Sequence, residues 1–110
     1  MTDRELLEMA AKAAGYTLEN HLDVHGKYWP WCVELERNWC PLTDDGDALR
    51  LAVKLKFRVH IREIEVSVDI YEGGAWQNQV VAGVRWNTDH YDTTRRAIVR
   101  AAAEIGRNMK

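Results

Sequence analysis

Two histidines and two cysteines lie close together in the first half of the chain. They are His21, His25, Cys32 and Cys40, with the spacing H-x3-H-x6-C-x7-C. Imidazole nitrogen and thiolate sulfur are zinc ligands, and a structural zinc site takes four of them in a tetrahedron. Such sites usually present their cysteines as close pairs, and this spacing contains none. We therefore expect no metal site, and the four residues remain only a weak zinc alternative.

A second group that could hold a metal ion is a run of carboxylates, Asp44, Asp45 and Asp47. Carboxylate oxygens bind calcium and magnesium, but a calcium-binding EF-hand loop needs a bidentate glutamate at its twelfth position. Counted from Asp44, that position is Leu55. Acidic side chains also stabilise the first turn of a helix. We interpret the run as a helix start, and the sequence indicates no cofactor.

The remaining histidines give no sign of a catalytic site. His60 lies between two arginines in a stretch that alternates like a strand, and His90 lies in a polar, turn-like stretch. Neither belongs to a nucleophile motif G-x-S-x-G, a metalloprotease motif H-E-x-x-H or a phosphate-binding glycine loop. We therefore predict that the protein is not an enzyme, with a zinc-dependent hydrolase as an alternative.

Aromatic and arginine side chains are the candidates for contacts with a partner. Exposed aromatic residues form hot spots in protein interfaces and can stack on nucleobases, and arginines bind carboxylate or phosphate groups. The ordinary alternative is core packing for the tryptophans and a solvated helix face for the arginines. The residues that we predict to contact a partner are Trp29, Trp31, Trp39, Tyr71, Arg96 and Arg100.

The charge of the chain favours a protein partner over nucleic acid. The 110 residues have a formal net charge of -2 and a pI of about 6.1, whereas nucleic-acid-binding domains usually carry a strongly basic face. Glu63, Glu65 and Asp69 are expected on the outward face of a hairpin, which together with the arginines of the last helix would make the surface bipolar. A nucleic-acid-binding module is kept as an alternative.

The composition predicts one domain in the cell interior. Residues 1–110 are long enough to form a single domain with its own core, and 46% of them are hydrophobic. No apolar run approaches the roughly 20 residues that span a bilayer. The first residues are too charged for a signal peptide. We expect a cytoplasmic protein with no membrane partner and with reduced cysteines.

Hydrophobic periodicity predicts three helices separated by strands. The first helix is expected to run from its N-cap Thr2 to Gly15, the second to begin at the carboxylate run, and the last to begin at Asp92 or Thr93. A strand is expected over 31–36, where apolar and polar residues alternate. These elements predict an α+β fold, a single compact domain whose antiparallel sheet of three to five strands carries about three helices mainly on one face.

The clearest strand signal lies between the second and third helices. Apolar residues change there from odd to even positions near Arg62, which predicts a turn or a bulge because alternation cannot otherwise change faces. The pair Gly73-Gly74 predicts a hairpin, and we favour a three-residue loop over 73–75 because it keeps apolar residues on one face. The pairs that this loop predicts are Val68–Val80, Val66–Ala82, Ile64–Val84 and Glu63–Arg85.

Three segments resemble small uncharacterised proteins of tailed phages and prophages. The clearest is the stretch W-C-P-L-T-D-D-G-D-A-L-R-L-A-V-K-L at 39–55, where an aromatic residue and a proline precede an Asp-Ala pair that begins a helix. The NinX-type proteins of lambdoid phages carry a related motif. The stretch T-R-R-A-I-V-R-A-A-A-E-I-G at 94–106 and the residues at 3–8 are similar to the two ends of the same proteins.

This resemblance implies a phage context and the cytoplasm of a bacterial host, and it assigns no activity to the chain. Together with the aromatic residues, it leads to the expected function, a small non-enzymatic phage- or prophage-encoded accessory protein that acts by protein–protein binding. The partner is an unknown host or phage protein. A narrower alternative is an inhibitor of a host defence system, similar to anti-CRISPR proteins.

Overall fold

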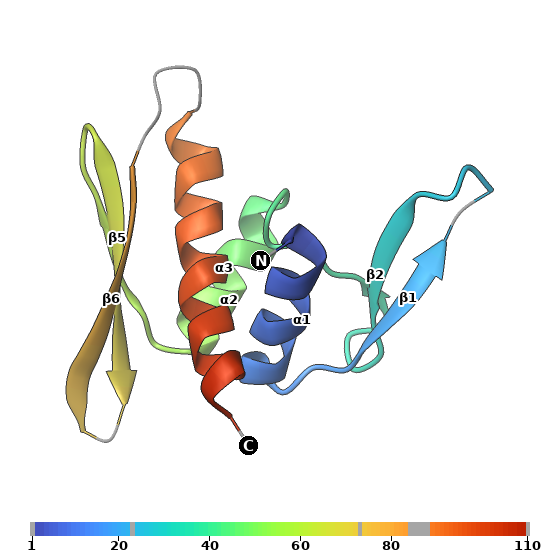
Figure 1. Cartoon of the computed structure of the whole chain (residues 1–110), viewed down its shortest axis with the longest axis horizontal. Coiled ribbons are helices and arrows are strands. Elements are labelled where there is room, and N and C mark those ends of the chain that lie inside the picture. The colour runs from blue at the N-terminus through green and yellow to red at the C-terminus, as the bar shows by residue number, and fades with distance from the viewer. Residues whose placement is uncertain (1, 23, 73, 84–88, 110) are drawn as a thin grey trace.

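The computed structural model describes residues 2–22, 24–72, 74–83 and 89–109. Within these residues three helices and six strands follow one another along the chain (Figure 1). Their bounds are α1 Asp3–Ala14, β1 Leu18–Leu22, β2 Tyr28–Cys32, β3 Arg37–Asn38, α2 Asp45–Lys54, β4 Arg58–Ile61, β5 Glu65–Glu72, β6 Ala75–Gly83 and α3 His90–Asn108. The predicted α+β class with three helices is confirmed.

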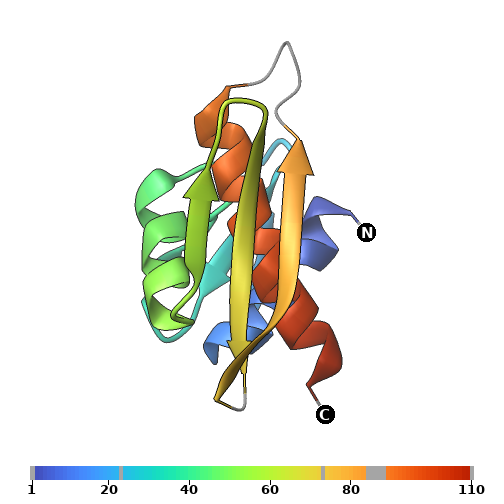
Figure 2. The same cartoon turned by 90° about the vertical axis from the view of Figure 1, so that its left-hand side faces the viewer.

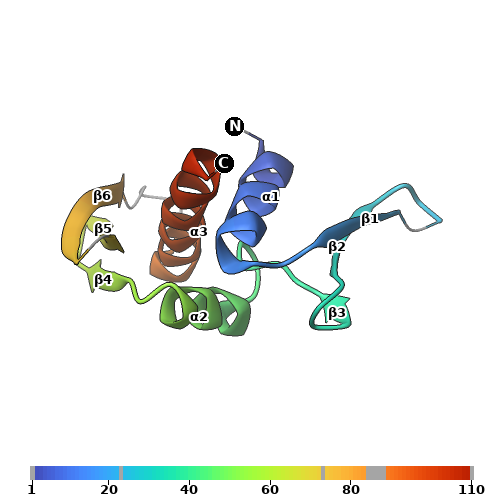
Figure 3. The same ribbon diagram turned by 90° about the horizontal axis from the view of Figure 1, so that it is seen from below.

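Helix α3 lies at the centre of the molecule, between one sheet and helix α1. The strands β4, β5 and β6 form an antiparallel sheet in that order, and it covers one side of α3 (Figures 1 and 3). Helix α2 lies beside β4 (Figure 2). The strands β1, β2 and β3 form a second antiparallel sheet, which extends away on the other side of the helices. The strands are thus divided between two sheets, whereas we expected one.

Helix α1 has the ends that the sequence predicts. The hydroxyl oxygen of Thr2 accepts a hydrogen bond from the Glu5 amide at 3.2 Å, which satisfies one of the free N–H groups of the first turn. Gly15 ends the helix with a φ of 80°, a conformation that glycine adopts without steric cost. Helix α1 is therefore placed by local chemistry at both ends.

Helices α1 and α3 pack closely through small side chains. Both helices bury several alanines, and Gly106 of α3 faces the backbone of α1. A Cβ atom at Gly106 would overlap the carbonyl oxygen of Met9. The absence of a side chain at this position is therefore what lets the two helices approach.

The predicted register of β5 and β6 is confirmed, but the predicted loop is wrong. Val68 pairs with Val80 and Val66 with Ala82, while the expected pairs Ile64–Val84 and Glu63–Arg85 fall partly outside the described residues. The last pair of the two strands is Glu72 with Ala75, whereas the predicted loop included Ala75. The loop is therefore one residue shorter than expected. A bulge after Ile70 adds a residue to β6 and restores the register.

The predicted turn between β4 and β5 is also confirmed. Strand β4 ends at Ile61 and β5 begins at Glu65. The outward face of this sheet is not acidic as expected, because basic side chains from β4 and the turn balance the acids. Asp69 lies 3.2 Å from Arg58, and Glu65 lies 3.4 Å from Arg62.

The strand expected over 31–36 is confirmed at Trp31 and Cys32 and is wrong at 33–36. Strand β2 ends at Cys32, and the chain turns through 33–36, with Glu36 at a φ of 54°. The turn carries the chain back along β2, so that the Trp39 amide donates to the Pro30 carbonyl at 2.8 Å. Proline has no N–H to return this bond, which is consistent with the short β3.

The start of α3 also differs from the prediction. Asp89, not Asp92 or Thr93, is the N-cap, and its carboxylate accepts from the Asp92 amide at 2.7 Å. Asp92 instead occupies the first turn, where a negative charge is favoured by the helix dipole. His90 is therefore the first residue of a helix rather than part of a loop.

Helix α2 begins among the acidic residues, as predicted, but one of them has a further role. Asp44 is the N-cap and accepts from the Asp47 amide at 2.8 Å. The Asp47 side chain is buried, and it accepts from the Cys40 amide at 3.0 Å. Its carboxylate also lies 2.8 Å from Arg37 and 3.1 Å from Arg50. Asp47 therefore joins α2, β3 and the segment between them.

Candidate functional site

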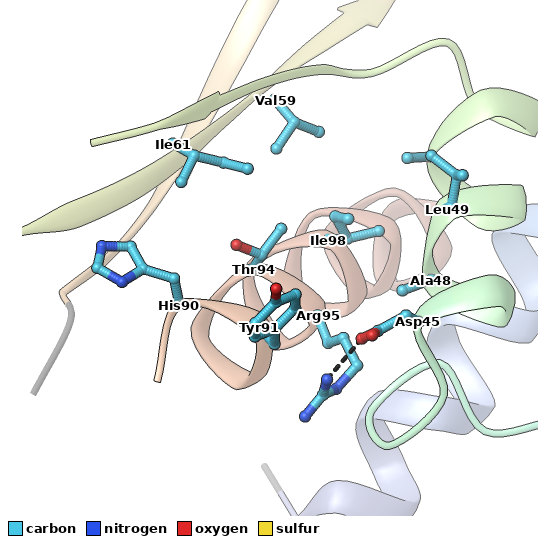
Figure 4. A pocket seen from close by; sticks show the side chains of 11 residues that line it. Asp45, Ala48, Leu49, Val59, Ile61, His90, Tyr91, Thr94, Arg95 and Ile98 are labelled. Atoms are coloured by element: carbon cyan, nitrogen blue, oxygen red, sulfur yellow. Dashed lines mark hydrogen bonds and ion pairs between the residues drawn. The ribbon is translucent and has the colours of Figure 1, made fainter. Parts of the chain in front are cut away.

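An apolar groove of about 410 Å³ lies where α2, β4 and the first half of α3 meet (Figure 4). Each element contributes side chains from one face. The lining residues are Asp45, Ala48, Leu49 and Ala52 of α2, Val59 and Ile61 of β4, and His90, Tyr91, Thr94, Arg95 and Ile98 of α3. A groove of this size, lined mostly by apolar groups, is typical of binding sites.

The side chains that line the groove share one face of each element, as the repeat of a helix or a strand requires. Positions four residues apart share a face of a helix, which places Asp45 and Leu49 together on α2 and Tyr91 and Arg95 together on α3. Alternate residues share a face of a strand, which places Val59 beside Ile61 on β4, as Figure 4 shows. The groove therefore exists only because these three faces meet.

Large apolar side chains on the rim of the groove are exposed to water. Leu49 is 64% exposed, Ile61 is 61% exposed and Tyr91 is 67% exposed. The floor is closed by small or buried side chains such as Ala48 and Ile98. Exposed apolar residues gathered from three elements differ from the scattered ones that any protein surface carries. This rim is the feature that a partner would cover.

An ion pair holds one end of the groove. Arg95 Nη1 lies 2.6 Å from the Asp45 carboxylate, and Arg95 Nε donates to the Leu42 carbonyl at 2.9 Å (Figure 4). The Arg95 side chain is 17% exposed, whereas that of Asp45 is 65% exposed. Arg95 therefore fastens α3 to the start of α2, and its charge is already engaged.

His90 holds the other end. Its Nε2 atom lies 2.9 Å from the Arg62 carbonyl oxygen and 3.0 Å from that of Glu63. Both oxygens are acceptors, so this nitrogen carries a hydrogen and donates to them. His90 thereby ties the start of α3 to the turn that follows β4. The polar groups around the groove thus position its walls, and the groove itself offers apolar contact.

Two of the predicted contact residues, Trp29 and Trp31, lie on one face of the β1–β2 hairpin. Trp29 is 37% exposed, and Lys27 Nζ lies 4.5 Å from the centre of its ring. Trp31 stacks on His21, with ring centroids 5.5 Å apart and nearly parallel planes. The hairpin points away from the groove (Figure 1), so these tryptophans belong to a different surface.

Trp39 cannot contact a partner as predicted, because it is a core residue. It is 2% exposed, and its ring meets that of Tyr16 edge to face at 5.6 Å. The turn at 33–36 folds this part of the chain back against the helices, which removes Trp39 from the surface. The alternative of core packing holds for this tryptophan.

The other predicted contact residues are at the surface but are not gathered together. Tyr71 is 44% exposed and meets Trp76 edge to face at 5.0 Å on the end of the β5–β6 hairpin. Arg96 binds Asp3 at 3.0 Å, and this hydrogen bond raises the pKa of the guanidinium. Arg100 donates to the Val81 carbonyl at 3.5 Å. Both arginines therefore connect α3 to neighbouring elements.

The structure does not bring the four zinc candidates together. His21 and Cys32 lie on opposite faces of the hairpin, because His21 pairs with Trp29 and Cys32 pairs with Leu18. Cys32 is buried, and His21 is hydrogen-bonded to Glu19 at 3.1 Å. Among the residues that the structure describes, no three His, Cys, Asp or Glu side chains are grouped to hold a metal ion.

The residues on the groove rim were missed by sequence reasoning. None of Leu49, Ile61 and Tyr91 is among the contact residues that the sequence predicts. One signal was present: Leu49 is an apolar residue of α2 that lies outside the buried stripe that includes Leu51. A large apolar residue outside the buried stripe of a short helix indicates either another core contact or an exposed patch.

Comparisons with protein-family models, with curated proteins and with solved structures give no match for this chain. The described residues form an α+β protein with two three-stranded antiparallel sheets, and the groove between α2, β4 and α3 is its candidate functional site. None of the helices in the described ranges has the length and apolar character that a membrane span needs.

Proposed function

We propose that this protein acts by binding another protein, and that the groove between α2, β4 and α3 is the binding site. The observation that carries the proposal is the exposed rim of Leu49, Ile61 and Tyr91. Each of these side chains leaves more than half of its surface in water. At about 25 cal/mol per Å² of apolar surface, covering them favours association.

The extent of the rim favours a protein over a small molecule. A small apolar ligand in the groove would contact Ala48 and Ile98 on the floor, but it would leave the outer surfaces of Leu49 and Tyr91 in water. A protein segment spans the groove and covers the rim at the same time. The charged groups nearby, Asp45 and Arg95, are already paired with each other. These features support binding rather than catalysis.

The biological setting rests on the resemblance of 39–55 and 94–106 to small phage accessory proteins. On that basis the partner belongs to a bacterial host or to a phage, and binding takes place in the host cytoplasm. The resemblance indicates that a bacterial lysate is the place to look for the partner. The proposal that the groove is the binding site rests instead on the exposure of its rim.

Two matched substitutions test the proposal. Leu49→Glu places a charge on the rim, whereas Val53→Glu places the same charge on the same helix at a residue that is 68% exposed and does not line the groove. We expect a host protein that copurifies with the parent chain to be lost with Leu49→Glu and kept with Val53→Glu. The purified partner is then titrated against both variants by calorimetry. Equal affinity for the two variants would contradict the proposal.

A further inference from the structure

Strand β4 has a free edge beside the groove. It pairs with β5 on one side, and no other described strand pairs with it. In Figure 2, helix α2 lies next to this edge. A free edge presents backbone N–H and C=O groups that another extended chain can bind.

The alternation of hydrogen-bonded pairs between β4 and β5 shows which residues of β4 direct their N–H and C=O groups to the free edge. The Arg62 amide donates to the Glu65 carbonyl at 2.8 Å, so these two residues form a bonded pair. Bonded and non-bonded pairs alternate along antiparallel strands. The pairs of Val59 with Val68 and of Ile61 with Val66 are therefore non-bonded. The N–H and C=O groups of Val59 and Ile61 accordingly point away from β5, towards the free edge.

The same two residues direct their side chains into the groove. Val59 and Ile61 line it from above in Figure 4, while Leu49 faces it from α2. The backbone groups available for pairing and the apolar surface available for burial therefore lie side by side. A strand added to β4 would place alternate side chains next to those of Val59 and Ile61, over the groove.

We propose that the segment bound in this groove is an extended strand of the partner protein, which pairs with β4 as a fourth strand and places alternate apolar side chains in the groove. The inference rests on the proposed function and names the form of the bound segment. The edge offers N–H donors and C=O acceptors at Val59 and Ile61, and the backbone of an extended chain supplies the complementary partner for each.

A helix in the groove fits these observations less well. A helix satisfies its own backbone hydrogen bonds. It would therefore cover the N–H and C=O groups of Val59 and Ile61 without pairing them, and buried polar groups without partners are costly. An added strand removes this cost, and it also covers Leu49, which lies on the helix beside the free edge. The backbone N–H and C=O groups of Val59 and Ile61 therefore favour a strand over a helix, whereas the apolar side chains of the groove do not distinguish the two.

The test uses the whole chain and an mRNA-displayed library of random peptides. Peptides selected on the parent chain are counter-tested on Leu49→Glu and Val53→Glu. We expect the selected peptides to lose about tenfold or more in affinity for Leu49→Glu and to keep their affinity for Val53→Glu. Selected peptides that bind both variants equally, or a selection without binders, would overturn the proposed function itself.

Backbone methylation then tests the strand. Each selected peptide is synthesised with single N-methyl groups along its length, which remove one N–H and leave the side chains unchanged. We expect alternate positions to lose about tenfold in affinity, the magnitude of one hydrogen bond, and the intervening positions to change little. Amide exchange at Val59 and Ile61, followed by NMR, is expected to slow on binding.

Other results would overturn the strand while leaving the groove as a binding site. These are affinities that do not alternate with the methyl position, or a gain of helical circular dichroism on binding. A further contrary result would come from sedimentation analysis, if the parent chain formed a dimer and the Leu49→Glu variant were a monomer. The groove would then be occupied by a second copy of the chain. Each of these outcomes is distinct from a failure of the Leu49→Glu test.

Discussion

The guanidinium of Arg37 on β3 lies 2.8 Å from the buried carboxylate of Asp47 on α2. Burial of Asp47 acts to raise its pKa, but hydrogen bonds from Arg37, the Cys40 amide and Arg50 outweigh burial and hold the pKa below its ordinary value. This pair is a direct link between the second sheet and the helices. Together with the buried side chains of Cys32 and Trp39, it holds the β1–β3 sheet to the rest of the molecule.

Replacing Asp47 is expected to destabilise the fold. Asp47→Asn removes the charge that Arg37 and Arg50 share, and we expect a loss of about 2–3 kcal/mol in the free energy of unfolding, measured by urea denaturation. Asp45→Asn is the control, because its ion pair with Arg95 is largely exposed on the Asp45 side and should contribute less than about 1 kcal/mol. Equal losses in the two variants would show that Asp47 has no special role.

The pKa of Asp47 also predicts a pH dependence. A carboxyl group with a lower pKa in the folded state binds protons less tightly than in the unfolded state, so it contributes stability above its unfolded pKa of about 3.9. That contribution is lost as the pH falls from about 4 through the folded pKa. The urea midpoint of the parent chain should therefore fall more steeply below about pH 4 than that of Asp47→Asn. Parallel curves would contradict the shift.

Gly106→Ala is expected to be destabilising although alanine is the better helix former. Helix propensity alone would favour alanine by about 1 kcal/mol. The added Cβ overlaps the carbonyl oxygen of Met9, however, and forces α1 and α3 apart. We expect a net loss of about 2 kcal/mol, seen as a lower melting temperature. Asn108→Ala, at an exposed position of the same helix, is the control, and a more stable Gly106→Ala variant would disprove the close contact.

The two environments of the tryptophans can be told apart by truncation. Trp39→Ala empties a core position and should cost about 3–5 kcal/mol in the free energy of unfolding. Trp29→Ala removes a side chain that is 37% exposed and should cost about 1 kcal/mol or less. Chemical denaturation measures both. A small loss for Trp39→Ala would mean that this residue is not part of the core.

Much of the fold could be predicted because the signals are local. Thr2 and Gly15 place the ends of α1 by hydrogen bonding and backbone conformation, and the alternation of valines sets the register of β5 with β6. The predicted loop at 73–75 failed because a bulge after Ile70 produces the same register with a shorter loop. Alternation reports which face a residue occupies, and it does not report where the extra residue is inserted.

The strand expected over 31–36 failed at 33–36 for a different reason. Val33 and Leu35 have the spacing of a buried strand face, yet both are exposed in the turn that precedes β3. The chain reverses there, so that the Trp39 amide donates to the Pro30 carbonyl and the Trp39 ring packs in the core against Tyr16. The stabilisation from burying Trp39 involves a residue far away in the chain, and a local sequence pattern does not contain it.

The amino-acid sequence by itself determined the α+β class, the two ends of α1 and the pairing of β5 with β6, because these depend on neighbours within a few residues or on a simple alternation. The tertiary structure alone decided that Trp39 is buried, that Asp47 joins three segments and that Leu49 and Ile61 form an exposed rim. The physical reason is that the exposure of a side chain depends on which faces of the helices and strands pack against each other. At the groove those faces come from α2, β4 and α3, and at Trp39 the partner is Tyr16, so in both cases the residues that meet are far apart in the chain.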